Sequence, residues 1–240
     1  MMLILSHLLF SYYYFGGWWN SSVGTILILF FSYLIWKKQL LEFTGLKLNL
    51  KTIIISLILA SCLIIFSYLM MNYLAGKHQV QIVFTTWQNY YHDVFYTLNE
   101  EIILGAILLN ISIRRYKMNP ILVSLLLALV FSIVHFVFYK WVFLERGIIT
   151  ISTIISLFLI GVTRNNIIIT TKHIGYSWAL HFSWMAIMFG SYHFFTETEQ
   201  ALTEYERFNL YLGSYEMLLI SVILAAVSFW FLKKKLKFKN

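Results

Sequence analysis

Two adjacent carboxylates, Glu100 and Glu101, lie in the stretch TLNEEIILG, inside a run that is otherwise apolar. An acid at the centre of a bilayer costs roughly 2.5–3.5 kcal/mol on insertion scales, so such a residue is expected to face a cavity or a partner. Glutamates in that setting are candidate general acids or bases. Two histidines, His135 and His181, are the other ionisable side chains expected deep in apolar segments.

Helical geometry predicts that these four side chains meet. The acids lie about eight residues, or roughly 12 Å, into a helix that starts near residue 92. His135 is expected near the end of a helix running the opposite way, and His181 about eight residues into another. All four then converge in the outer half of the bilayer. Because successive helical residues diverge by about 100°, we expect one glutamate to face a cavity and the other to brace it from the side.

Composition indicates the environment of these residues. Of 240 residues, 60% are hydrophobic and 12% are charged, whereas a soluble domain has roughly 25% charged residues. The sequence predicts one all-α, polytopic membrane domain over residues 1–240. About 20 apolar residues cross a bilayer as a helix. On that scale we expect about eight spans, at 2–18, 21–36, 52–74, 92–112, 120–139, 147–163, 173–191 and 214–232.

Basic residues support this topology. With the N-terminus in the cytoplasm, the loops at 37–51, 113–119 and 164–172 and the C-terminal tail are cytoplasmic, and they contain 14 of the 18 Lys and Arg residues. Arg164 and Lys172 are counted among these loop residues. This asymmetry is what the positive-inside rule predicts. The net charge of +8 then reflects orientation and contact with anionic lipid, and no nucleic-acid partner is expected.

Other kinds of site are disfavoured. A single cysteine, Cys62, excludes an internal disulfide and a cysteine-based metal site. We expect no cofactor and no metal. A zinc site made of His135, His181 and one glutamate is the alternative, although the chain has no HExxH helix. A transporter would also use membrane-embedded Glu and His, but no inverted repeat supports one.

The polar residues also resemble the motifs of a known family. Glu100-Glu101 in NEEIILGAIL, Phe131 and His135 in LVFSIVHFVF, and His181 in YSWALHFSWM resemble the EExxxR, FxxxH and HxxxN motifs of the CPBP family. That family comprises type II CAAX prenyl endopeptidases and bacteriocin-processing or immunity proteins, often labelled Abi. The resemblance covers about residues 90–190 and implies a CAAX prenyl endopeptidase-like core.

The resemblance implies a glutamate-dependent intramembrane endopeptidase. By similarity, Glu100 would activate a water molecule and His135 would hold that water. His181 would donate a hydrogen bond to the oxyanion, and Glu101 would orient its neighbours. Phe131, one helical turn before His135, would pack against that ring.

Two positions depart from the family pattern: Gly105 stands where the motif has Arg, and Met185 where it has Asn. The acids therefore lack the expected counter-charge. Arg114 is nine residues along the helix, about 13.5 Å away, and cannot replace it. Candidates for the missing oxyanion donor are Trp184, Ser183, Asn99 and Tyr176.

The expected function is cleavage of a small exported or membrane-associated peptide precursor, of the pheromone or bacteriocin type. The alternative is a non-catalytic bacteriocin self-immunity protein on the same scaffold. The expected partners are a peptide or membrane-protein substrate and the lipid bilayer. The expected location is the plasma membrane, with both termini cytoplasmic, and a Lys-, Ile- and Phe-rich composition is typical of a low-GC bacterium.

Overall fold

The computed structural model describes residue 3 and residues 17–46, 49–84, 86–137, 149–188, 191–195 and 204–237. Within these ranges, the side chains of 134–137, 191–195 and 204–205 are not described. The described residues form α2 (Asn20–Trp36), η1 (Lys37–Gln39), α3 (Leu40–Phe43), α4 (Leu50–Lys77), β1 (Val80–Phe84), α5 (Trp87–Glu100), η2 (Glu101–Ile107), α6 (Leu108–Asn110), η3 (Ile111–Arg115), α7 (Pro120–Val137), α8 (Ile151–Thr171), α9 (Gly175–Met188), β2 (Ser191–Phe195), α10 (Glu204–Tyr211) and α11 (Tyr215–Lys237).

Five helices are long and apolar enough to cross a membrane: Asn20–Phe43, Leu50–Lys77, Trp87–Arg115, Ile151–Thr171 and Tyr215–Lys237. They coincide with five of the spans that the sequence predicts. The apolar helix Pro120–Ile133 is shorter, and α9 has 14 residues, or about 21 Å. The first predicted span, 2–18, lies almost wholly outside the described residues. The total of eight and the CAAX-like core remain predictions.

The long helices divide into an interior and a peripheral set. Buried residues make up 56% of the most apolar window of Trp87–Arg115 and 61% of that of α8, against 22%, 17% and 22% for the helices that begin at Asn20, Leu50 and Tyr215. Large apolar side chains such as Ile58, Leu69 and Ile223 are more than half exposed on the peripheral helices. Apolar surface of this kind is what a lipid environment covers, so the peripheral helices present the lipid-facing surface.

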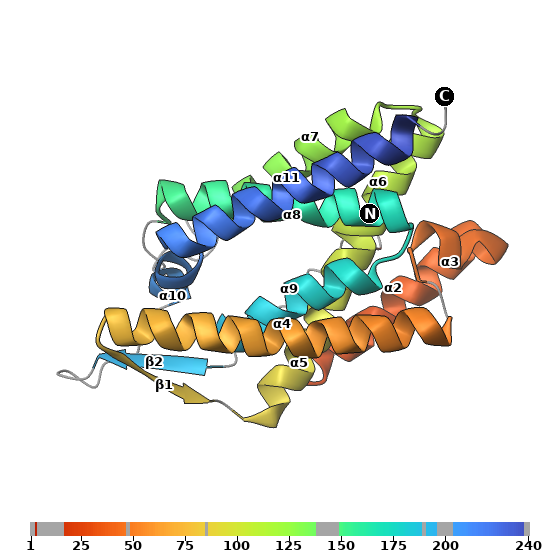
Figure 1. The fold of residues 1–240 in the computed structure, drawn as a ribbon. Coiled ribbons are helices and arrows are strands. Elements are labelled where there is room, and N and C mark those ends of the chain that lie inside the picture. The colour runs from red at the N-terminus through yellow and green to blue at the C-terminus, as the bar shows by residue number, and fades with distance from the viewer. Residues whose placement is uncertain are drawn as a thin grey trace.

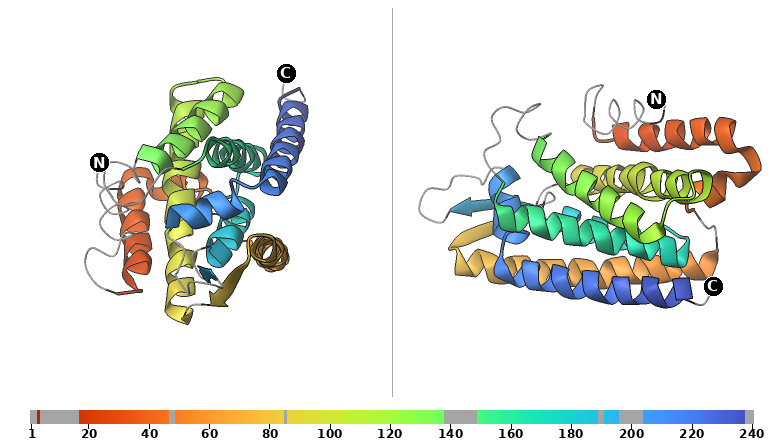
Figure 2. Two further views of the ribbon diagram at one scale, coloured as in Figure 1. Left: turned by 90° about the vertical axis from the view of Figure 1, so that its left-hand side faces the viewer. Right: turned by 90° about the horizontal axis from the view of Figure 1, so that it is seen from above.

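Figures 1 and 2 show how the helices surround the site. In one layer α8 packs against α7 and α11, and in the other α4 packs against α9. The continuous helix of α5, η2, α6 and η3 runs through the middle of the molecule and crosses α4 obliquely. Its 29 residues are about 43 Å long, more than the roughly 30 Å of a hydrocarbon core, and this excess length permits a tilt.

The central helix changes its winding at the acids. Residues Trp87–Glu100 are α-helical, whereas Glu101–Ile107 and Ile111–Arg115 are π-helical. A π turn inserts an extra residue per turn and re-aims the side chains that follow it, and such turns are frequent at functional sites. The transition occurs between Glu100 and Glu101, which changes how these two side chains can be oriented.

Two features of the fold differ from the sequence-based prediction. First, the structure is not purely helical, because β1 and β2 form a two-stranded antiparallel sheet in which Val80 is opposite Phe195 and Phe84 is opposite Ser191. Second, α8 does not end at residue 163, as predicted, but continues to Thr171. The predicted loop at 164–172 is therefore mostly helix, and Arg164, Asn165 and Asn166 are buried inside the bundle.

The polar sequence at 164–166 is stable within α8 because other helices satisfy it. Asn165 Nδ2 donates to the Ser124 carbonyl at 2.9 Å, and Ser124 Oγ donates to Asn166 Oδ1 at 2.7 Å. Asn166 Nδ2 in turn donates to Ser228 Oγ of α11 at 3.2 Å. Hydrogen bonds of this kind across α7, α8 and α11 offset part of the cost of burying the amides, although Asn165 Oδ1 has no hydrogen-bond partner among the described residues.

Candidate active site

Glu100 and Glu101 lie in the interior of the bundle, at the junction of α5 and η2. Their residues are 4% and 0% exposed. A buried carboxylate requires hydrogen-bonding or charged partners. The partners come from α8 and α9, which pack close to this part of the central helix.

His181 of α9 lies between the two carboxylates. Its Nδ1 is 3.0 Å from Glu101 Oε1, and its Nε2 is 3.6 Å from Glu100 Oε2. With a proton on Nδ1, the ring donates a hydrogen bond to Glu101 and presents Nε2 to Glu100. The structure thus brings together three of the four side chains predicted to meet: Glu100, Glu101 and His181.

The relative orientation of the acids differs from the prediction. One glutamate was expected to face a cavity while the other braced it from the side, as an ideal α-helix requires. Instead, both carboxylates reach the same imidazole, one on each ring nitrogen. The change from α to π winding at Glu101 provides the physical reason, since it abolishes the regular 100° step on which the expectation depended.

Arg164 of α8 places a positive charge beside Glu101, although position 105 carries no arginine. Its Nε is 3.6 Å from Glu101 Oε1, and the residue is 2% exposed. The sequence analysis counted Arg164 as a cytoplasmic loop residue, and this assignment is wrong. The polar run Arg164-Asn165-Asn166 is typical of a loop, and only contacts with other helices keep it inside.

Gly105 provides the space in which this arrangement packs. A Cβ at position 105 would lie 2.8 Å from Ile168 Cδ1, 3.3 Å from Glu101 Oε2 and 3.7 Å from Arg164 Nη2. The volume that a side chain at 105 would need is therefore occupied by α8. Gly105 leaves room for α8 to approach the central helix, and Arg164 of α8 then provides the counter-charge to Glu101.

Phe131 of α7 closes one side of the cluster. Its ring lies edge-on to His181 with a centroid distance of 6.0 Å, and Arg164 Cζ lies 4.7 Å from its centroid. A guanidinium over an aromatic face gains a cation–π interaction, which is strongest where water is excluded. Gly161 lets α8 approach α7, because its Cβ would lie 3.1 Å from Ala128 Cα and 3.2 Å from Phe131 Cδ1.

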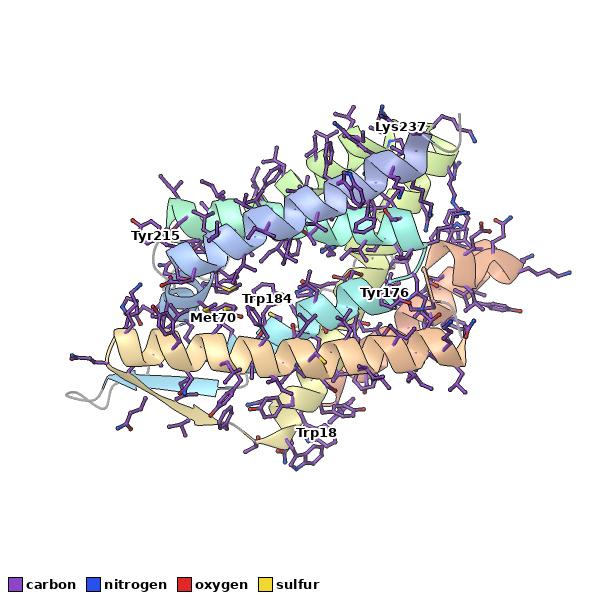
Figure 3. The ribbon with its side chains drawn as sticks, viewed as in Figure 1. Trp18, Met70, Tyr176, Trp184, Tyr215 and Lys237 are labelled. Atoms are coloured by element: carbon purple, nitrogen blue, oxygen red, sulfur yellow. The ribbon has the colours of Figure 1, made fainter. Side chains whose placement is uncertain are left out.

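Trp184 is the strongest of the candidates for the missing oxyanion donor. Its ring stacks on His181 with a centroid distance of 5.4 Å, and Figure 3 shows it in the interior between α4 and the layer of α8 and α11. Its indole N–H is buried and makes no hydrogen bond to the described part of the chain. By contrast, Asn99 donates to Ser21 O, and the Ser183 hydroxyl donates to Leu180 O.

Tyr176 and Met185 complete the comparison with the family motif. Tyr176 is only partly buried and lies beside His173 near the start of α9, two helical turns from Trp184 (Figure 3). Met185 is 7% exposed and packs in the apolar core with Trp184 and Phe131. The position that carries Asn in the family motif is thus part of the apolar packing here.

Two predictions, the role of His135 and the metal site, depend on the His135 side chain, which the structure does not describe. The backbone of His135 lies on α7, one turn after Phe131, but its side chain is outside the described side chains. Its predicted contact with Phe131 and with water remains a prediction. No group of three metal-ligating side chains that could hold an ion occurs among the described residues. The zinc alternative depends on His135 and remains a hypothesis.

Two further polar residues of the central helix are buried near the acids and were not among the predicted site residues. His92 and Asp93 are 5% and 7% exposed. His92 Nδ1 lies 3.5 Å from Asp93 Oδ1, and Asp93 is within electrostatic range of His181 and Arg207. The seven-residue spacing of Asp93 and Glu100 places them on one face of α5, and this signal could have been read from sequence.

Comparison of the chain with protein-family models, with curated proteins and with solved structures gives no match.

Proposed function

We propose that this chain is an intramembrane, glutamate-dependent endopeptidase that cleaves a small membrane-associated or exported peptide. The observation that carries the proposal is the buried cluster in which His181 lies between Glu100 and Glu101 while Arg164 pairs with Glu101. Burying four charged or titratable groups for packing alone is unfavourable, because apolar residues of similar volume are often at least as stable. Such clusters mark functional sites in membrane helices.

Glu100 is the proposed general base. Glu101 is engaged by both His181 and Arg164, and the Glu100 carboxylate lies beside the other ring nitrogen of His181. Glu100 takes a proton from water, and the hydroxide oxygen bonds to the peptide carbonyl carbon. The proton then passes to the amide nitrogen, the C–N bond breaks, and a carboxylic acid and an amine are released. This cycle returns Glu100 to its starting form.

His181, Glu101 and Arg164 are the proposed positioning residues. Both ring nitrogens of His181 face carboxylates, so we assign the ring to orienting the acids. The Trp184 indole N–H is then the proposed donor to the oxyanion, in the role that a preorganised hydrogen bond has in acyl transfer. His135 remains the proposed ligand of the attacking water.

The test is peptide cleavage by purified protein in lipid nanodiscs. The probe is a panel of quenched fluorogenic peptides with apolar segments, and mass spectrometry identifies the products. We expect Glu100→Gln to lose at least about a hundredfold of the rate, the usual lower bound for general-base catalysis. Glu216→Gln, at a surface ion pair with Lys77, is the matched control. Equal cleavage by wild type and Glu100→Gln would refute the proposal.

A non-catalytic immunity protein is the second candidate. It is favoured by the burial of both acids and by Met185, which places an apolar side chain where the family motif has a polar one. In this role the cluster would stabilise the bundle and a bacteriocin would be the partner. Cells that express Glu100→Gln at wild-type levels would then retain full protection against the bacteriocin.

The proposed setting is a bacterial plasma membrane with both termini in the cytoplasm. The grouping of basic side chains at the ends of η3, α8 and α11 supports this orientation. In the helix Trp87–Arg115 the acids are residues 14 and 15 of 29, so they lie midway along it and not in the outer half that the sequence predicts. The preference for exported peptides as substrates therefore stays a prediction. Cysteine accessibility at Lys237 and Tyr215, at the two ends of α11 (Figure 3), tests the orientation.

A further inference from the structure

A cavity lies at the end of the bundle where α8 and α11 finish, away from the acid cluster. Its volume is about 260 Å³, below the roughly 300–1,000 Å³ of sites that enclose a drug-sized molecule. It lies near the C-terminal end of α11, which Lys237 marks in Figure 3. A cavity of this size fits a headgroup rather than a whole lipid or peptide.

The charges around this cavity are unbalanced. Arg114, Lys172 and Lys235 line it together with one carboxylate, Glu42, so the lining carries a net charge of +2. Arg114 forms an ion pair with Glu42, and Lys235 donates to the Thr170 carbonyl. These contacts hold two of the cations at the rim of the cavity.

The walls of the cavity are apolar. Leu109 and Ile113 of the central helix, Ile168 and Ile169 of α8, and Leu232 and Leu236 of α11 line it. A cationic rim above aliphatic walls matches a molecule that has an anionic phosphate group joined to hydrocarbon. Basic pockets between transmembrane helices are a known binding mode for anionic lipid headgroups.

Helix capping explains only part of this arrangement. Arg114 lies in the last turn of η3, Lys172 caps α8, and Lys235 lies in the last turn of α11. A cation is favoured at each of these helix C-termini by the helix dipole. Capping does not require three separate helix ends to direct their cations around one cavity with aliphatic lining, and this convergence favours an anionic ligand.

We infer that this cavity binds the phosphate group of an anionic phospholipid, with Arg114, Lys172 and Lys235 around the headgroup and the aliphatic walls along the start of the acyl chains. The inference does not depend on the proposed activity, since none of these side chains belongs to the acid cluster. The two sites are nevertheless connected through one wall residue, Ile168, which lines the cavity and also packs against Gly105 beside the acids. An occupied cavity would therefore support the helix that holds Arg164.

The experiment measures lipid binding by native mass spectrometry of detergent-purified protein. Phosphatidylglycerol, phosphatidylcholine and inorganic phosphate are titrated separately. We expect phosphatidylglycerol to bind wild type more tightly than the other two ligands do. Its affinity for Lys172→Gln/Lys235→Gln should be about thirtyfold lower, because each of the two lysines contributes about fivefold to the affinity for an anionic lipid. Lys172→Arg/Lys235→Arg keeps the charge and should retain the binding.

The matched control is Lys38→Gln/Lys237→Gln, which removes two exposed lysines outside the cavity and should bind phosphatidylglycerol as wild type does. Equal loss in the lining and control variants would overturn the inference, as would equal binding of the two lipids to wild type. Inorganic phosphate that binds as tightly as phosphatidylglycerol would overturn the assignment to a lipid. The comparison of the three ligands needs only wild-type protein, so it decides the question even if a variant fails to fold.

Discussion

Arg164 Nε lies 3.6 Å from Glu101 Oε1, and the side chains of these two residues are 3% and 0% exposed. The arginine comes from α8 and the glutamate from the central helix, and the glycine at position 105 leaves the space through which they meet. The positive charge beside the acids thus comes from α8, whereas the family motif has an arginine at the position of Gly105, on the same helix as the acids. Four predictions follow from the geometry around this pair.

Removal of the Arg164 charge should destabilise the protein strongly. Arg164→Gln leaves Glu101 buried without its counter-charge, and breaking a buried pair in this way costs about 3–5 kcal/mol. Thermal unfolding in nanodiscs measures the effect, and Arg115→Gln, at an exposed position, is the control. A wild-type melting temperature for Arg164→Gln would show that the pair does not contribute.

The same charge should be movable to the position that it has in the family motif. Gly105→Arg/Arg164→Ala/Ile168→Ala installs the arginine next to the acids and removes the two side chains that occupy its space. We expect this triple variant to recover part of the stability and cleavage rate lost in Arg164→Ala. The triple variant remaining as impaired as Arg164→Ala would argue that Arg164 has a role beyond its charge.

Position 105 should tolerate alanine but not a larger side chain. Gly105→Ala brings a Cβ close to the flexible end of Ile168, and its gain in helix propensity offsets that contact. Gly105→Leu should lose about 1–3 kcal/mol through overpacking. Combining Gly105→Leu with Ile168→Ala should restore part of that loss, and unfolding of the single and double variants measures the coupling. Additive losses would contradict the packing described here.

Trp184→Phe should separate catalysis from packing. The substitution keeps an aromatic ring stacked on His181 but removes the indole N–H, so the melting temperature should change little. If the N–H binds the oxyanion, kcat should fall about 10²–10³-fold while KM stays nearly constant. Trp178→Phe, on the same helix and with its own N–H bonded to Val94 O, is the comparison. Unchanged kcat in Trp184→Phe would exclude the indole as the donor.

The local pattern of the sequence was sufficient to identify the acids and most of the helices. A pair of glutamates in an apolar run can be recognised without a structure, because the cost of burying a charge predicts a nearby partner. The same reasoning identified His181, whereas Phe131 was named only through the resemblance to the family motif. Apolar segments of membrane-spanning length marked five helices, since helix length follows from bilayer thickness alone.

Only the tertiary structure decided how the two acids are held. The π turn at Glu101, the burial of Asp93 and the continuation of α8 past residue 163 all depend on contacts between segments far apart in sequence. The sheet of β1 and β2 joins segments more than a hundred residues apart and has no signal in either one alone. Arg164 reads as a loop residue until Ser124, Ser228 and Glu101 satisfy the polar run to which it belongs, because a helix can bury such residues only where other helices supply their partners.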